Sequence, residues 1–87
     1  MNKSYFNADS NIISANLRKY RKQRGMSQEE LAARMQLLGV DISQPLISKI
    51  ELGQRFVKDY ELACFCHILS IGEHDLLADF YERLADE

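Results

Sequence analysis

Two helix starts lie close together in the middle of this 87-residue chain and restrict it to a fold of short helices. The first is an S-x-x-E capping box at Ser27 and Glu30. The Ser27 hydroxyl can accept from the backbone N–H of Glu30, and the Glu30 carboxylate can accept from that of Ser27. Met26 and Leu31 flank the box at the spacing of a hydrophobic staple. The pattern predicts a helix over residues 28–38.

The second start is at Ser43, a residue type that caps helices. Pro45 follows in the first turn, where the N–H that proline lacks would have no helical partner. Gly53 then offers a left-handed stop, so a helix is predicted over residues 44–52. Two helices this close are typical of a helix-turn-helix, here residues 27–53, whose second helix usually enters the DNA major groove.

Apolar residues recur at helical spacing in three further segments, which predicts helices over residues 12–24, 60–69 and 73–85. Ser10 or Asn11 is expected to cap the first of these, and Asp59 the second. The side chains expected to face the core are Ile13, Leu17, Tyr20, Leu31, Ala32, Met35, Leu38, Ile47, Ile50, Leu62, Phe65, Cys66 and Leu69. On the last helix, the apolar stripe consists of Leu76, Leu77, Phe80 and Leu84.

The chain has no convincing strand pattern, repeat or low-complexity run. It is therefore predicted to form one all-α domain of five helices over residues 12–87, with an extended last helix, after a flexible tail of residues 1–11. Its apolar runs are too short to span a membrane, and its start lacks the pattern of a signal peptide. The chain also has only two cysteines, whereas small secreted domains are usually rich in disulfides. A cytoplasmic location is therefore expected.

The charge is divided unevenly along the chain. Residues 1–58 hold ten Lys or Arg against five Asp or Glu, whereas residues 59–87 hold one Arg against eight acidic residues, for a net charge of −2. Such asymmetry hints at nucleic-acid contact by the basic part, and the acidic part should weaken indiscriminate binding. The alternative is a solvated surface that happens to be unevenly charged.

Residues about 12–77 resemble the lambda-repressor-like helix-turn-helix domain of the XRE/Cro/CI family. The matching residues are Leu17, Tyr20, Arg21, Gly25, the S-Q-E-E-L-A of residues 27–32, the I-S-K-I-E-L-G of residues 47–53, and the pair Leu76 and Leu77. The connection from Leu31 to Ser48 is longer than is usual in the family. Helix 28–38 is expected to have gained a turn, and the turn after it a residue or two.

The resemblance places Gln44, Pro45 and Lys49 on the outer face of helix 44–52. The helical spacing supports this placement. If Ile47 and Ile50 face the core, then Gln44, Leu46 and Lys49 must face outward or sideways. Glutamine can pair with adenine, lysine can donate to guanine, and Leu46 or Pro45 can touch a thymine methyl group. The predicted base contacts are Gln44, Pro45, Leu46 and Lys49. The alternative is an exposed helix face with ordinary polar residues.

Gln28 opens its helix at a position that binds a phosphate in the family, and helix N-termini attract anions. The predicted phosphate contacts are Gln28, Ser43, Arg55 and Lys58, with Lys22 and Arg24 as weaker candidates. The resemblance also implies an ion pair between Arg21 and Glu51 that fixes the second helix of the motif to the first helix of the domain.

The sequence holds no pattern typical of an enzyme. It has no nucleophile–base set and no glycine-rich phosphate loop. Cys64 and Cys66 are two residues apart on a helix and so face different sides, which makes a metal pair a poor hypothesis. No metal, cofactor or small-molecule ligand is therefore expected.

The expected function is sequence-specific binding of double-stranded DNA by a small Cro- or repressor-like regulator, as a homodimer on a pseudo-palindromic operator. An apolar stripe larger than one small core needs predicts the dimer interface, with residues Leu76, Leu77, Phe80, Tyr81 and Leu84. The alternative is a protein-interaction module, such as an antitoxin-like or anti-regulator partner, that uses its last two helices and its acidic C-terminal part.

Overall fold

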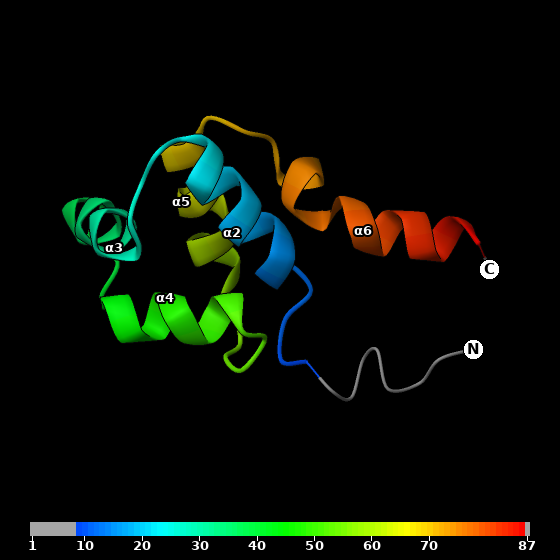
Figure 1. Ribbon diagram of the computed structural model, residues 1–87, viewed down its shortest axis with the longest axis horizontal. Helices are drawn as coiled ribbons and strands as arrows, with labels where there is room; N and C mark the ends of the chain where they lie inside the picture. The colour runs from blue at the N-terminus through cyan, green and yellow to red at the C-terminus, as the bar shows by residue number, and fades with distance from the viewer. Residues whose placement is uncertain (1–8, 87) are drawn as a thin grey trace.

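Five helices follow one another in the computed structural model, which describes residues 9–86 (Figure 1). The predicted all-α fold is confirmed, and no strand occurs in this described range. The helices are α2 (Ser14–Gln23), α3 (Gln28–Leu37), α4 (Gln44–Glu51), α5 (Asp59–Leu69) and α6 (Glu73–Ala85).

The predicted capping box starts α3. The backbone N–H of Glu30 donates to the Ser27 hydroxyl at 3.0 Å, and that of Ser27 donates to the Glu30 carboxylate at 3.0 Å. Hydrogen bonding to the Glu30 carboxylate, from the Ser27 backbone first and then from the Ser27 side chain, lowers the pKa of Glu30 because it favours the charged form.

Three other helix starts differ from the prediction. No side chain caps α2, which begins at Ser14 rather than residue 12. Asp59 is the first residue of α5 and not its cap, because the Glu61 carboxylate accepts the Lys58 N–H one residue earlier. Ser43 precedes α4 as predicted, but its side chain makes no capping hydrogen bond.

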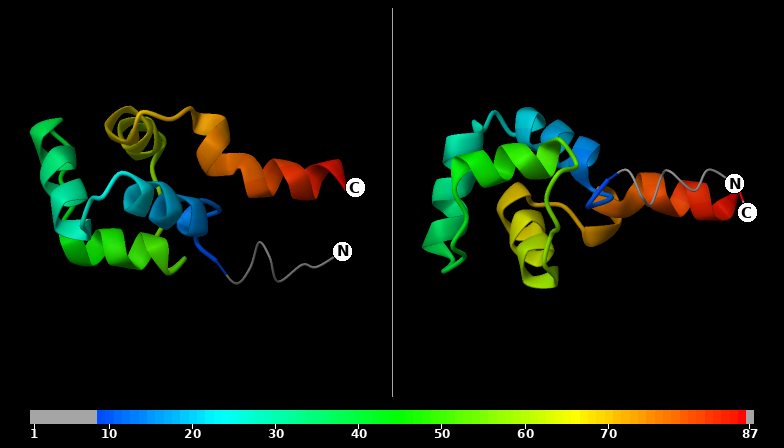
Figure 2. Two further views of the ribbon diagram at one scale, coloured as in Figure 1. Left: turned by 45° about the horizontal axis from the view of Figure 1, so that its top comes forward. Right: turned by 90° about the horizontal axis from the view of Figure 1, so that it is seen from below.

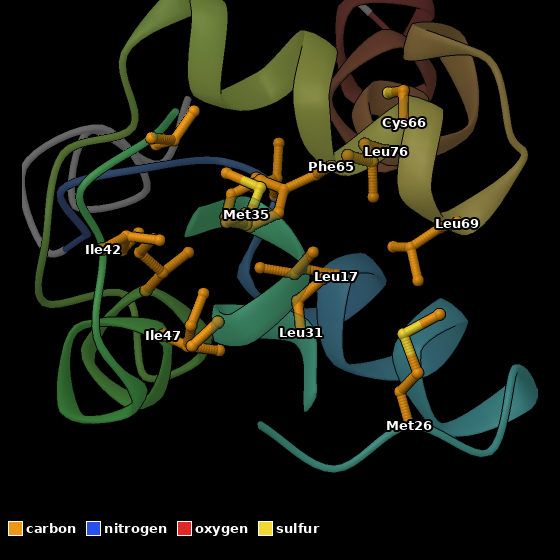
Figure 3. Close-up of a cluster of buried hydrophobic side chains, with 14 residues drawn as sticks. Leu17, Met26, Leu31, Met35, Ile42, Ile47, Phe65, Cys66, Leu69 and Leu76 are labelled. Carbon is orange, nitrogen blue, oxygen red and sulfur yellow. The ribbon is translucent and has the colours of Figure 1, made fainter. Parts of the chain in front are cut away.

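The core lies where α2, α3, α4 and α5 meet, and the first half of α6 closes one side of it (Figure 3). The side chains with no exposed surface include Leu17, Leu31, Met35, Ile42, Ile47, Ile50, Phe65, Leu69 and Leu76. Burying one such side chain stabilises the fold by roughly 1.5–3 kcal/mol. One residue expected in this core, Leu38, is exposed instead, because it lies just beyond the end of α3.

The second half of α6 extends away from the other helices, and every residue from 81 to 86 is exposed (Figures 1 and 2). The described part of the chain is accordingly elongated, with extents of 40 × 22 × 21 Å. Leu76 alone anchors α6 as a fully buried side chain. None of the described helices has the length and apolar character needed to cross a membrane.

Candidate nucleic-acid interface

One side of α4 is apolar and packs into the core, so the remaining side chains of the helix form its outer face. Ile47 and Ile50 are fully buried, which leaves Pro45 and Lys49 exposed and Gln44 half-buried. Leu46 is also half-buried and packs against the core, so less of it is available on this face.

The side chain of Gln44 is held in place through α3. Its amide nitrogen donates to Gln28 Oε1 at 2.9 Å, and Gln28 Nε2 donates to Glu51 Oε1 at 3.0 Å. A carboxylate can only accept, so Gln28 must turn its NH2 group to Glu51 and its carbonyl oxygen to Gln44. The orientation of the Gln44 amide therefore depends on the charge of Glu51.

Glu51 is itself held by Arg21 from α2. Arg21 Nε donates to Glu51 Oε2 at 2.6 Å and Nη2 donates to Oε1 at 2.9 Å, while Nη1 donates to the Met26 carbonyl at 2.8 Å. The two side chains are only 8% and 3% exposed. The hydrogen bond to Glu51 raises the pKa of the Arg21 guanidinium. Arg21 and Glu51, which the resemblance paired, thus form an ion pair in the structure. Hydrogen bonds extend this pair to Gln28 and Gln44.

The other end of α4 is held by Asn11. Its Nδ2 donates to the carbonyl oxygens of Ile50 and Arg55, each at 3.0 Å, and its Oδ1 accepts from the Ile13 N–H at 3.0 Å. Ser10 N donates to the Gly53 carbonyl at 2.8 Å. Most of the predicted flexible tail, residues 1–8, lies outside the described residues, but residues 10 and 11 are held against the domain.

Both the backbone conformation and the close approach of Asp9 require a glycine at position 53. Its φ of +74° lies in the left-handed region, and a Cβ on this residue would be 2.7 Å from Asp9 Oδ1. A side chain would therefore be strained by the backbone conformation and would also displace Asp9.

Arg55 is bound within the domain. It donates from Nη1 and Nη2 to the two carboxylate oxygens of Glu61 at 2.9 and 3.1 Å, and from Nη1 to the Phe56 carbonyl at 2.9 Å. The Glu61 side chain is 2% exposed. Burial alone would raise the pKa of Glu61, but the hydrogen bonds from Arg55 and from the Lys58 backbone outweigh it and lower the pKa.

The other basic candidates differ in their surroundings. Lys58 is exposed, with its Nζ 5.8 Å from the centre of the Tyr60 ring. Arg24 donates to the Leu69 carbonyl at 2.7 Å and to the Ser70 carbonyl at 3.4 Å, so it holds the end of α5. Lys22 and Ser43 are exposed.

Comparison with known proteins finds a match over the part of the chain that carries this geometry. The model of the family described as helix-turn-helix matches residues 17–55. These residues belong to the XRE/lambda-repressor-like helix-turn-helix family. The family consists of DNA-binding regulatory domains rather than enzymes. No curated protein and no solved structure matches the chain.

The helix-turn-helix match runs from Leu17 to Arg55 and covers the whole chain of contacts from Arg21 through Glu51 and Gln28 to Gln44. Asn11 and Glu61 lie outside it. The sequence predicts Asn11 only as a possible helix cap and predicts no role for Glu61. The only sign in the sequence that Glu61 is buried is its position among the apolar residues of α5.

The α6 residues assigned to a dimer interface fall into three groups. Leu76 is fully buried in the helix-turn-helix domain itself, so its assignment to an interface is wrong. Leu77 and Phe80 are half-buried. Tyr81 and Leu84 are 47% and 46% exposed, and the Tyr81 ring stacks on His74 with 5.0 Å between ring centroids.

Neither cysteine forms a disulfide in this domain. Cys66 is buried, and that burial, with Glu73 and Asp75 nearby, raises the pKa of its thiol to about 11. Cys64 is half-buried. Among residues 9–86 no group of three or more His, Cys, Asp or Glu is placed to hold a metal ion.

Proposed function

We propose that this protein is a sequence-specific transcriptional regulator that binds double-stranded DNA in the cytoplasm and acts by occupying its operator. The family match indicates a DNA-binding regulator of the XRE type. The observation that carries the more specific proposal is the outer face of α4, where Gln44 is held by Gln28, Glu51 and Arg21. A side chain held in advance loses less conformational freedom when it binds.

Base contacts are assigned to the exposed side of α4. Gln44 has its carbonyl oxygen for the N6 donor and a second N–H for the N7 acceptor of an adenine, and Lys49 is exposed and can donate to guanine. Pro45 is exposed beside them and can contact a thymine methyl group. Leu46 is a lesser candidate because it packs partly against the core.

Phosphate contacts are assigned around this face. Gln28 uses one N–H on Glu51 and retains another, at the start of α3, where anions are favoured. Ser43 and Lys58 are exposed. The Arg55 guanidinium already faces the Glu61 carboxylate, which offsets its charge, so Arg55 is a weaker phosphate contact than Lys58.

We assign the homodimer to the exposed side of α6, with Leu77, Phe80, Tyr81 and Leu84 as its residues. The second half of this helix extends away from the domain with two apolar side chains nearly half exposed. Two copies related by a two-fold axis would bind the two halves of a pseudo-palindromic operator, with recognition helices about 34 Å apart.

A protein-interaction module is the second candidate function. It is favoured by the same α6, whose exposed apolar residues lie among Asp79, Glu82 and Asp86. A basic partner protein would suit this surface, and such a partner would not need the outer face of α4.

A titration separates the two functions. A fluorescent operator selected from a random DNA pool is titrated with the wild-type protein and with Lys49→Ala, beside an unrelated duplex. The DNA-binding function predicts tighter binding to the selected duplex and a loss of that preference in Lys49→Ala. Equal, weak binding of both proteins to both duplexes would contradict it and leave the interaction module.

A further inference from the structure

Four side chains from three helices form one series of hydrogen bonds that ends at the outer face of α4. Its members, in order, are Arg21 of α2, Glu51 of α4, Gln28 of α3 and Gln44 of α4. The donor–acceptor distances along it lie between 2.6 and 3.0 Å. Only the last member, Gln44, is among the proposed base contacts.

Arg21 fixes the direction of every hydrogen bond in this series. A guanidinium has donors and no acceptor, so the two oxygens of Glu51 that it faces must both accept. Glu51 Oε1 accepts from Arg21 Nη2 at 2.9 Å and from Gln28 Nε2 at 3.0 Å. Since this oxygen has nothing to donate, Gln28 can turn only its NH2 group toward Glu51.

Gln28 passes this direction on to Gln44. With its NH2 group on Glu51, Gln28 offers its carbonyl oxygen to the start of α4, and Gln44 Nε2 donates to that oxygen at 2.9 Å. If the Gln44 amide were turned over, two carbonyl oxygens would face each other. If Gln28 were turned over as well, its oxygen would face the Glu51 carboxylate. Only one orientation of the two amides therefore satisfies all the groups.

The orientation of a glutamine amide matters because adenine and guanine differ at one position of the major-groove edge. Both bases carry the N7 acceptor, but adenine has the N6 amino donor where guanine has the O6 acceptor. An amide that presents its oxygen to this position suits adenine. The same amide turned over presents an N–H there and suits guanine. The choice between the two purines therefore depends on what holds the amide.

We propose that Glu51 is a positioning residue that makes Gln44 select adenine over guanine. The inference rests on the proposed base contact of Gln44 and adds the origin of its selectivity. The Glu51 side chain is 3% exposed and so is not available to a base. It acts through Gln28, whose amide it orients, and Arg21 keeps both of its oxygens as acceptors.

A purely structural role of Glu51 makes a different prediction. The pair with Arg21 links α2 to α4, so its loss would shift the whole recognition helix and weaken every base contact alike. A positioning role affects the base pair read by Gln44 and no other. The base pair read by Lys49 is therefore an internal control, because Lys49 is exposed on the same helix and takes no part in this series.

The test measures dissociation constants by fluorescence titration on a selected operator and on duplexes that each carry one base-pair change. Gln44→Ala and Lys49→Ala first identify the base pair that each residue reads, as the position where the variant no longer discriminates. Glu51→Gln keeps the size of the side chain but adds a donor, so the two glutamine amides can turn over. We expect the preference for adenine over guanine at the Gln44 position to fall about fivefold or more. The preference at the Lys49 position should not change.

Gln28→Met tests the same link without touching the ion pair. Methionine has a similar length and no amide, so it leaves Gln44 unheld while Arg21 and Glu51 stay paired. This variant should fold and show the same loss of preference for adenine over guanine. Glu29→Gln is the matched control for Glu51→Gln, since it removes an exposed carboxylate of α3 that lies outside the series. It should leave both preferences unchanged.

The outcomes separate the roles, and circular dichroism melts show which variants are folded. Equal losses at the two positions in folded Glu51→Gln, or no loss at the Gln44 position, would overturn the proposal. If Glu51→Gln does not fold, Gln28→Met decides, and a retained preference for adenine overturns it. A selected operator without adenine at the Gln44 position also contradicts it. If Gln44→Ala loses discrimination at no base pair, the proposed base contact itself is wrong.

Discussion

Glu61 is a buried carboxylate whose charge is balanced by its neighbours. Its side chain is 2% exposed, and it accepts from both terminal nitrogens of Arg55 and from the Lys58 backbone. Removing one partner of a buried pair leaves the other charge uncompensated, which is more destabilising than losing an exposed pair. We therefore expect Arg55 to matter for stability before it matters for DNA binding.

The lowered pKa of Glu61 predicts a pH dependence of stability. Since the folded pKa lies below the unfolded value of about 4.3, the pair stabilises the fold above pH 4.3, and this contribution is lost as the pH falls through the folded pKa. Glu61→Gln should melt at a lower temperature than the wild type at pH 7. The difference should shrink toward pH 3 in melts followed by circular dichroism. A difference that is constant from pH 7 to pH 3 would contradict the assignment.

Lys49 and Lys58 offer a matched pair for separating base contacts from phosphate contacts, because both are exposed lysines. Base contacts discriminate between sequences by about 1–3 kcal/mol, whereas phosphate contacts carry no sequence information. Lys49→Ala should reduce the difference in affinity between operator and unrelated duplex. Lys58→Ala should weaken both about equally and reduce the salt slope by roughly 0.9.

Titrations of both variants on both duplexes at several salt concentrations give the measurement. If Lys49→Ala behaves like Lys58→Ala, then Lys49 contacts the backbone, and the recognition face of α4 is rotated from the one proposed.

At the scale of elements, α4 is held at both ends by polar side chains from other segments. Its start is linked to α3 through Gln44 and Gln28, and its end is linked to the segment before α2 through Asn11. Arg21 adds a connection from α2 to Glu51. A short helix of eight residues is marginal alone, so these contacts and its buried isoleucines determine its position.

The Arg21–Glu51 pair should therefore affect folding and DNA binding together. Both side chains are nearly buried, and loss of one partner costs about 3–5 kcal/mol. Arg21→Ala should lower the melting temperature by more than about 10 °C and weaken operator binding. Arg18→Ala, on an exposed position of the same helix, is the control. Unchanged melting and unchanged binding in Arg21→Ala would mean that the pair is not structural.

Asn11→Asp tests the contact at the other end of α4 with little other change. The variant keeps a side-chain oxygen for the Ile13 N–H but loses the donor to the Ile50 and Arg55 carbonyls. Two lost hydrogen bonds predict a destabilisation of about 1–3 kcal/mol, measurable by urea unfolding. We expect operator affinity to fall as well. Full affinity in a variant that is destabilised by this amount would show that Asn11 stabilises the domain without positioning α4.

At the scale of the whole molecule, the basic and acidic parts of the chain serve different surfaces. The proposed DNA-binding face is built from residues of the basic part, and α6 with its acidic residues extends away from the other helices. Repulsion between this part and phosphates favours one orientation on DNA.

The proposed homodimer should determine how the protein binds an operator with two halves. Leu84→Asp should bind a single half-site as the wild type does, since Leu84 is far along α6 from residues 17–55. It should lose the wild-type preference for the complete pseudo-palindrome, which depends on two linked recognition helices. Fluorescence titration on half-site and full-site duplexes gives the comparison. A full-site preference retained by Leu84→Asp would contradict a dimer through α6.

Features that depend on neighbours in the chain could be predicted from the sequence. The capping box of Ser27 and Glu30 joins residues three apart, and the helix-ending Gly53 acts through its own φ. Helix caps together with helical spacing predicted five helices to within a few residues and most of the core. The matched stretch I-S-K-I-E-L-G led to the helix-turn-helix family, and only the family resemblance paired Arg21 with Glu51.

Only the tertiary structure decided which distant groups meet. Asn11 contacts carbonyls 39 and 44 positions away, and Gln44 contacts Gln28 across the turn. Local patterns carry no information on such pairs, because they depend on how whole helices pack. The same packing decided that Leu76 is buried while Leu84, on the same apolar stripe, is exposed beyond the edge of the domain. A period along a helix identifies its apolar side, but the neighbouring helices determine how much of that side they cover.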